Sequence, residues 1–493
     1  MKTQIYLISL IFVLSACSET LNVEPVTFTS GENYYQTASQ IETAINGAYG
    51  KLQPLYTGDF YVFTEMRADN TTFFFNPNNR CCVPREEVDY FLMNAVNDRV
   101  ENVWDAIYSG IQQSNVVLNR IENVSFPEES KKSQFIGEAK FIRALLYFHL
   151  VRLYGPVPLK NKEIEDPSEV FTDERASIEQ VYQQIISDAE DASNRLPASY
   201  EGSDIGRATK GAALTLLGDV YVTQKDFSSA VSTLREVTNL NYSLVPNYEN
   251  VFNPNNKNNS ESIFEVQYSA SAEGENSNFI FLFGPWNASV ALTGFQGQLE
   301  SMNIPTPSII EAYEDGDERK EASVGYYVDP ENSGFDEALG DSMPFIKKYY
   351  HPPYERQGQT DENWPVYRYS DVLLMLAEAI NETDGPTSEA YGYVDEVRQR
   401  AGLDPLATGL SQSEFRDAVY QEQRVELAFE NKRWFDLIRT DRAIEIMNAH
   451  GAEEKQRLNR VTSEMFNVEE HQLLFPIPAK EVRLNGFSQN PGW

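Results

Sequence analysis

The sequence is poor in the residues that build most catalytic and metal sites. Its 493 residues include three cysteines and four scattered histidines, His149, His351, His450 and His471. Three cysteines cannot form a disulfide framework, and a zinc site needs ligands that converge. The sequence contains no glycine-rich phosphate loop, no Gly-x-Ser-x-Gly elbow and no His-Glu-x-x-His motif. We therefore expect no metal, no cofactor and no enzymatic activity. A catalytic pair of carboxylates, as in glycoside hydrolases, has no motif of this kind, and 74 acidic residues are present.

Basic residues are also scarce. Lysine and arginine number 40 against 74 acidic residues, which gives a formal net charge of −34 and a pI near 4.5. Such a chain repels nucleic acid and anionic lipid, so neither is expected as a main partner. Beyond the first residues, no apolar run approaches the length of a membrane-spanning helix, because the nearest, residues 372–380, is interrupted by Glu378.

The only long apolar run lies at the start of the chain. Lys2 precedes an apolar stretch over residues 5–14, and the sequence Leu-Ser-Ala-Cys then ends at Cys17. A charged start, an apolar stretch and small residues before the cleavage point are typical of a signal peptide. A cysteine at that point indicates a lipobox, whose thiol receives a diacylglyceryl group. We expect residues 1–16 to be removed, Cys17 to carry lipid, and residues 17–32 to form a flexible leash to a membrane.

The other two cysteines, Cys81 and Cys82, are adjacent. In an oxidising exterior they either close a vicinal disulfide that stiffens their loop or remain thiols. The sequence does not decide between these alternatives.

The periodicity of apolar residues divides the rest of the chain into three zones. In residues 33–243, apolar residues recur every three to four positions, which predicts amphipathic helices over about 104–121 and 141–154. A further helix over about 178–195 is expected to be capped by Asp173. Two helices over 210–223 and 227–240, with small residues where they would touch, predict a hairpin like those of tetratricopeptide repeats.

The other two zones differ in composition. Residues 244–365 are rich in Asn, Gly, Pro and aromatics, which predicts loops with small strands such as 263–268. Residues 366–493 return to helix over 366–381, 390–401 and 413–439, and the proline-punctuated tail from residue 473 is expected to lie extended against the body.

Several segments in these zones resemble the SusD/RagB family of surface lipoproteins of Bacteroidetes. One segment runs from Arg143 to the Tyr-Gly-Pro-Val-Pro-Leu turn that ends at Leu159, and another begins at Gly206-Arg207. The other matching segments are Arg368 to Ala379, Val397 to Leu403, Glu422 to Arg439, Leu474 to Pro478, and the closing Gln489 to Trp493. Within them, Glu430 with Arg433 and Asp436 with Arg439 have i,i+3 spacing, which we interpret as helix-surface ion pairs of structural importance.

The resemblance implies a mainly α fold, with tetratricopeptide-like hairpins as a scaffold and an irregular, loop-rich ligand region. It implies a protein on the outer face of the outer membrane that binds oligo- or polysaccharide without cleaving it. The ligand would pass to a SusC-like TonB-dependent transporter. The alternative is an oligopeptide receptor similar to RagB.

Sugar binding calls for aromatic platforms flanked by polar groups, and two stretches supply both. The predicted ligand-binding residues are Asp69, Asn70, Phe73, Phe74, Phe75, Arg80, Trp286 and Asn287. Trp364 is a weaker candidate, and the alternating Phe279, Phe281 and Phe283 are also consistent with the buried face of a strand. An anionic glycan would require Arg67, Arg80, Arg85 and Arg99 to form a basic island.

Overall fold

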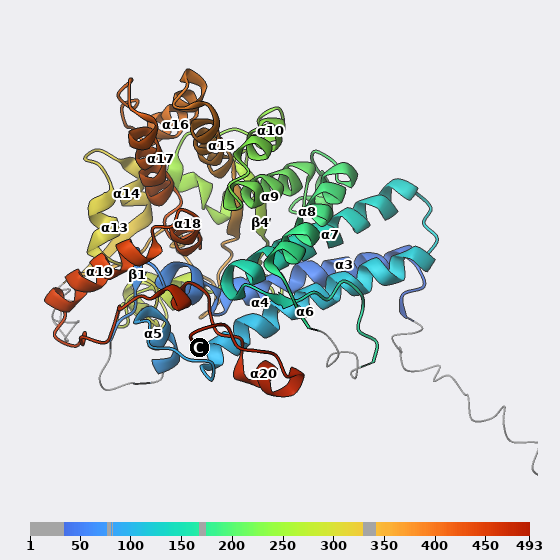
Figure 1. Cartoon of the computed structure of the whole chain (residues 1–493), viewed down its shortest axis with the longest axis horizontal. Coiled ribbons are helices and arrows are strands. Elements are labelled where there is room, and N and C mark those ends of the chain that lie inside the picture. Colours follow the sequence, from blue (N-terminus) through green and yellow to red (C-terminus); the bar gives the residue numbers. More distant parts are fainter. Residues whose placement is uncertain (1–33, 76–79, 81, 167–173, 329–341) are drawn as a thin grey trace, which may run out of the picture.

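The computed structural model describes residues 34–75, 80, 82–166, 174–328 and 342–493 (Figure 1). The expected signal peptide, leash and lipid-bearing Cys17 lie outside the described residues, as does the pairing of Cys81 with Cys82. Within the described part of the chain the fold is mainly helical and its strands are short, as predicted.

The N-terminal part is a stack of helices, three of them long (Figure 1). They are α3 (Ala38–Gly50), α4 (Leu52–Thr57), α5 (Val83–Asp89), α6 (Asp98–Arg120), α7 (Glu129–Tyr154), α8 (Ile178–Arg195), α9 (Lys210–Thr223) and α10 (Phe227–Thr238). Single turns of other helix types interrupt them: the π-helical η1 (Val62–Met66) and the 3₁₀ segments η2 (Ile121–Asn123) and η4 (Gly202–Asp204).

Local signals in the sequence set where these helices begin and end. The Ser177 side chain caps α8 by accepting from the backbone N–H of Gln180 at 3.3 Å, so this serine takes the role predicted for Asp173, which lies outside the described residues. Helix α7 ends at Gly155, whose φ of +70° favours glycine. The predicted hairpin of α9 and α10 is confirmed. Its helices approach closely at Gly218, where a Cβ atom would lie 2.3 Å from a methyl carbon of Leu234.

The middle zone consists of loops with short elements, as expected. Its helical pieces are η5 (Tyr248–Val251), η6 (Pro254–Asn256), α11 (Phe279–Phe283), α12 (Ser289–Thr293), α13 (Pro307–Ala312) and α14 (Glu318–Ser323). The strands of the described chain are β1 (Thr71–Thr72), β2 (Val157–Pro158), β3 (Arg175–Ala176), β4 (Ser262–Val266), β5 (Ile304–Pro305), β6 (Val324–Val328), β7 (Ser342–Ile346) and β8 (Trp364–Arg368). They pair antiparallel in twos, as β1–β5, β2–β3, β4–β8 and β6–β7.

The C-terminal part returns to helix. It contains α15 (Tyr369–Asp384), α16 (Ser388–Arg400), α17 (Gln412–Glu426), α18 (Arg433–Arg439), α19 (Ala443–Arg457), η7 (Glu470–Leu473) and α20 (Ala479–Asn485). Two predicted helices differ from those in the structure. Residues 366–368 belong to strand β8, and the single helix expected over 413–439 breaks between α17 and α18, where Phe429 and Asn431 have φ of 69° and 63°.

The tail lies against the body, as predicted, although it includes α20. The Lys480 ammonium contacts Glu101 of α6 at 2.7 Å. Most buried apolar side chains, from Ile41 to Phe487, belong to one large core cluster, so the three zones pack around shared interior surface. A second, smaller cluster consists of Val245, Tyr248, Val251, Phe252 and Ala322. Among the described residues, no helix is long and apolar enough to span a membrane.

Candidate functional site

The first predicted binding stretch leaves η1 and enters strand β1, and its first polar residue is buried. Asp69 is 3% exposed and accepts two hydrogen bonds from Arg433, Nε–Oδ1 at 2.7 Å and Nη2–Oδ2 at 2.9 Å. Arg424 contacts the same carboxylate at 2.9 Å. Burial alone would raise the pKa of Asp69, but the two guanidinium groups hold it well below its usual range. Asp69 is therefore an internal anchor and presents no surface to a ligand.

Asn70 and Phe73 are buried as well, contrary to their predicted role. The Asn70 side-chain oxygen accepts from Arg424 Nε at 2.9 Å, and its amide nitrogen donates to Glu65 at 3.3 Å. Phe73 is 2% exposed and packs edge-on against Tyr90, with ring centroids 5.2 Å apart. These side chains fix the course of the segment, so they position the residues that follow them.

Phe75 and Arg80 lie at the surface but contact each other. The Arg80 guanidinium lies 4.6 Å from the ring centroid of Phe75, and that of Arg460 lies 5.1 Å from it. Arg80 also forms a two-pronged ion pair with Glu86, at 2.8 and 2.5 Å. The ring of Phe75 is therefore occupied by cation–π contacts.

The backbone segments that carry Phe74 and Trp286 lie close together, although 212 positions separate the two residues in the sequence. The backbone N–H of Phe74 donates to Ser301 O at 2.9 Å, and the N–H of Ser301 donates to Gly284 O at 3.1 Å. Trp286 O accepts from Leu299 N at 3.2 Å on the same segment. Three segments thus run side by side, and two of them carry the half-buried residues Phe74 and Trp286.

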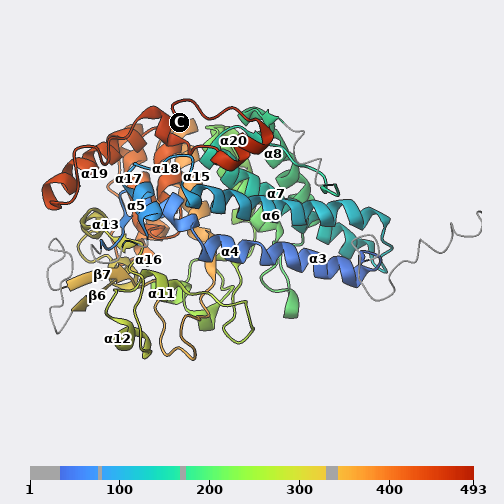
Figure 2. The ribbon, with the colours of Figure 1, turned by 90° about the horizontal axis from the view of Figure 1, so that it is seen from below.

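Two more half-buried rings adjoin this region. Phe281 O accepts from Glu300 N at 2.9 Å, and the Phe281 ring lies 6.0 Å from that of Tyr354. We use the name aromatic loop face for the half-buried residues Phe74, Phe281, Trp286, Asn287 and Tyr354 on these connected segments. Figure 2 shows its helix α11 on the side of the molecule that carries the yellow-green loops. Tyr354 gave no signal in the sequence, because it follows two prolines in a segment without periodicity.

The other predicted platforms are core residues. Phe279 and Phe283 are 0% exposed and belong to helix α11, so the strand interpretation of the alternating phenylalanines is wrong. A helix separates residues i and i+4 by about one turn, which places these two on its buried side. Trp364 is also fully buried and stacks on Tyr349, with centroids 4.9 Å apart.

Arg85 anchors the loop beneath the aromatic loop face. It contacts Asp59 at 3.0 Å and Glu300 at 3.2 Å, and Arg99 contacts the other oxygen of Asp59 at 2.9 Å. Arg67 is fully buried and donates to the carbonyls of Val88 and Gln472 at 2.6 and 3.0 Å. The four arginines do not form the basic island considered for an anionic glycan, because Arg67 is buried and Arg80, Arg85 and Arg99 are each paired with a carboxylate.

The family-like motif residues lie in a buried ion-pair network. Arg368 is 1% exposed and contacts Glu261, Glu426 and Glu430 at 2.5, 2.9 and 2.8 Å. The predicted pair of Asp436 with Arg439 is present at 2.8 Å, but the Arg439 side chain is only 6% exposed and also contacts Glu378, so the pair is not on the surface. The predicted pair of Glu430 with Arg433 is wrong. Glu430 instead pairs with Arg368 and Lys348 inside the protein.

This network ties distant segments together and offers no reactive group to a ligand. A buried charge without a partner costs several kcal/mol, so such carboxylates and arginines must occur as matched sets. Within the described residues, no group of three His, Cys, Asp or Glu side chains is arranged to hold a metal ion.

Comparison with known proteins is consistent with this geometry. Residues 260–493 match the family described as SusD, and residues 29–222 match a family described as starch-binding associating with outer membrane. The chain belongs to the SusD family. Of the curated relatives, SusD-like protein P2 of Formosa agariphila is 27% identical, and the alignment covers 100% of both chains.

Solved SusD-like structures share the whole fold. A laminarin-binding SusD-like protein is 25% identical, with a TM-score of 0.78 over 93% of this chain and 100% of the other. A SusD homologue from Bacteroides thetaiotaomicron is also 25% identical, with a TM-score of 0.79 over 95% of this chain and 99% of the other. The mainly α, SusD-like fold expected from the sequence is confirmed.

Proposed function

We propose that this SusD-family protein binds a neutral oligo- or polysaccharide on its aromatic loop face and does not cleave it. The observation that carries the proposal is the backbone connection that places Phe74 beside the Trp286 segment through Ser301. Half-buried rings held by main-chain hydrogen bonds lose little freedom when a sugar stacks on them. Asn287, next to Trp286, is half-buried with its Oδ1 enclosed by the protein, so we expect its amide N–H groups to be the part that reaches sugar hydroxyls.

The charges around the face favour a neutral ligand. Arg80, Arg85 and Arg99 are each paired with a carboxylate, so they offer no free positive charge to sulfate or uronate groups. The formal charge of −34 adds a further repulsion for a polyanion. The laminarin-binding neighbour, which shares the fold over nearly the whole chain, supports a glucan-type ligand.

The place of action follows from the lipobox and from the family. Cys17, lipidated, would tether the protein to the outer membrane, with residues 17–32 as a leash. The captured glycan would then pass to a SusC-like TonB-dependent transporter as the body swings on this leash. The description of the N-terminal match as associating with outer membrane supports this location.

Affinity gel electrophoresis against a glycan panel tests the ligand. Laminarin or another neutral glycan should retard the protein, and Trp286→Ala and Phe74→Ala should each reduce the affinity at least about fivefold, since stacked aromatic contacts contribute about 1 kcal/mol or more. Tyr393→Ala is the matched control, because this half-buried tyrosine lies on α16, away from the face. Retardation by no glycan, with tight binding of oligopeptides, would replace this proposal by the RagB-like alternative.

A further inference from the structure

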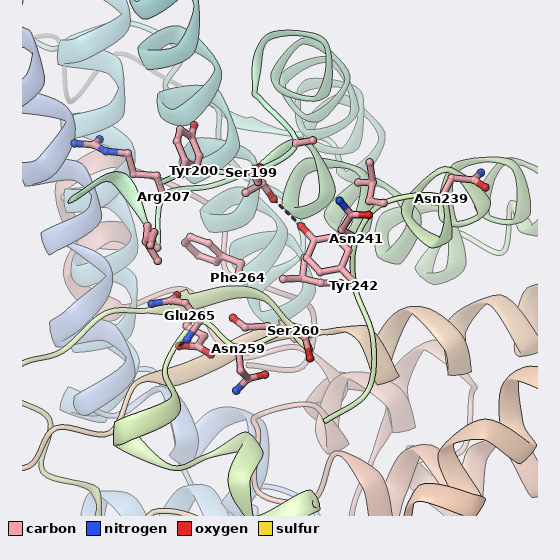
Figure 3. Close-up of a pocket in the computed structure, with 18 residues that line it drawn as sticks. Ser199, Tyr200, Arg207, Asn239, Asn241, Tyr242, Asn259, Ser260, Phe264 and Glu265 are labelled. Carbon is pink, nitrogen blue, oxygen red and sulfur yellow. Dashed lines mark hydrogen bonds between the residues drawn. The ribbon is translucent and has the colours of Figure 1, made fainter. Parts of the chain in front are cut away.

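A hollow lies where loops of the helical scaffold meet strand β4. None of the five residues of the aromatic loop face lines it. It consists of two adjoining cavities of about 270 and 400 Å³, which share Ile205, Gly206, Arg207, Phe264 and Glu265. We call the pair the scaffold trough. Figure 3 shows side chains from the segments 198–209, 239–242 and 258–265 converging on the first cavity. Periodicity could not predict the trough, because it is assembled from loops far apart in the sequence.

Neutral hydrogen-bonding groups dominate the lining of the first cavity. Ten of its eighteen residues carry a hydroxyl or an amide: Ser199, Tyr200, Thr209, Asn239, Asn241, Tyr242, Asn258, Asn259, Ser260 and Ser262. Of the eighteen, only Arg207 has a basic side chain and only Glu265 an acidic one. This lining differs from the rest of a chain in which charged residues make up 23%.

Both charged residues of the first cavity have partners within the protein. Arg207 contacts Glu138 at 2.9 Å and Asp204 at 2.8 Å. Glu265 is 6% exposed and accepts from the Asn363 amide at 2.8 Å, and burial raises the pKa of its carboxyl. The first cavity therefore presents mainly hydroxyls and amides, and its one guanidinium is already paired, which suits a polyhydroxylated neutral ligand and disfavours a charged peptide.

The trough is also rigid and has ring surfaces. The half-buried Tyr242 shares a hydrogen bond with Thr209, O–O at 3.0 Å, and packs so closely on Gly211 that a Cβ atom there would lie 2.3 Å from its hydroxyl. Asn258 and Gln267 exchange two amide hydrogen bonds of 2.9 Å at the junction of the cavities. Preformed polar groups beside tyrosine rings meet the requirements of a sugar site.

We propose that the scaffold trough is a second binding site for neutral saccharide on the same protein. This inference rests on the proposed function, because it assigns to the trough the same class of ligand. The second cavity extends to Ser269, Ala272 and Glu275, which lead along the chain into α11 and the aromatic loop face. Two sites on one protein retain a long polymer more firmly than either site alone, by an effective-concentration effect.

Blocking the trough from its rim tests the inference. Asn241 is exposed and lines the first cavity, so Asn241→Trp should obstruct the trough without disturbing the core. Asn255→Trp is the matched control, since Asn255 is equally an exposed asparagine but lines neither cavity. Each variant is made in the full chain, alone and combined with Trp286→Ala, and is run through gels that contain laminarin or amylopectin.

The expected result has two parts. Asn241→Trp weakens retention by the polymer about tenfold and leaves the affinity for laminarihexaose at the aromatic loop face unchanged, while Asn255→Trp changes neither. The Trp286→Ala protein keeps weak retention, which Asn241→Trp abolishes. One outcome would overturn the inference: Asn241→Trp changes polymer retention no more than Asn255→Trp does, and Trp286→Ala alone abolishes polymer retention. The trough is then not a saccharide site, and the proposed function stands. If the unaltered protein is retained by no neutral glycan, both proposals fail.

Discussion

Arg433 and Asp69 form a two-pronged, buried ion pair that joins helix α18 to the segment carrying Phe74. The two residues are 364 positions apart. Arg424, from α17, contacts the same carboxylate. The C-terminal motif residues thus fix the start of the proposed binding face, which explains why a motif without ligand contacts still serves binding.

Replacing Asp69 should therefore lower the stability of the fold, and it should affect glycan binding only through that loss. We expect Asp69→Asn to lower the free energy of unfolding by about 3 kcal/mol, because it leaves two buried guanidinium groups without their anion. Urea denaturation followed by circular dichroism measures the change. Glu389→Gln, which removes an exposed partner of Arg235, is the control and should cost about 0.5 kcal/mol or less. Loss of glycan binding by Asp69→Asn at an unchanged unfolding midpoint would contradict this assignment.

Glu65 predicts a specific dependence of stability on pH. Burial raises its pKa to about 7, although its carboxylate accepts from the backbone N–H groups of Phe429 and Asn431 at 3.0 and 3.1 Å. A folded-state pKa above the unfolded value of 4.5 means that the folded protein holds the extra proton between these pH values. The contribution of Glu65 to stability is therefore present below pH 4.5 and is lost as the pH rises toward 7.

The variant Glu65→Gln isolates this contribution. We take the unfolding free energy of Glu65→Gln minus that of the unaltered protein. This difference should increase by about 2–3 kcal/mol between pH 4.5 and pH 7.5, because glutamine does not titrate whereas Glu65 loses its proton. Denaturant titrations at four pH values measure the difference, in which the other titrating groups largely cancel. A difference that stays constant across this range would show that Glu65 has an ordinary pKa.

Neighbouring phenylalanines should differ in their effect on binding. The ring of Phe75 is engaged by Arg80 and Arg460, whereas Phe74 belongs to the aromatic loop face. Phe75→Ala should therefore change glycan affinity less than about twofold, and Phe74→Ala at least about fivefold. Isothermal titration calorimetry with laminarihexaose compares the two, and equal losses would contradict the proposed division.

Cys17→Ala should release the protein from the membrane. The proposed function attaches the lipid to the thiol that this variant lacks, and a chain with a formal charge of −34 is repelled by anionic lipid. Fractionation of the producing cells, with detection by antibody, measures the distribution between membrane and soluble pools. A variant that stays in the membrane fraction would show that the lipobox interpretation is wrong.

Helices could be predicted well from the sequence because their signals are local. The hairpin of α9 and α10 follows from apolar periodicity and a polar break between the helices, and α7 ends at the expected glycine. The ion-pair partners of the motif carboxylates were harder to predict, because spacing along one helix reveals only neighbours on that helix. The partners of Arg368 include Glu261, 107 positions away, and no local pattern could indicate that contact.

The candidate site was predictable in part. Aromatic and asparagine-rich loops drew attention to Phe74 and Trp286, which are half-buried, but composition could not show that Asp69, Asn70 and Phe73 are buried. Their burial depends on Arg424, Arg433 and Tyr90, which come from other segments. Contacts across hundreds of residues decide which members of a polar-aromatic stretch face the solvent.

A crystal structure of the protein with laminarihexaose would show most directly whether the aromatic loop face binds sugar. We expect sugar rings stacked on Trp286 and Phe74, with an amide N–H of Asn287 bonded to a hydroxyl. Oligosaccharide density that leaves both rings bare would contradict this expectation.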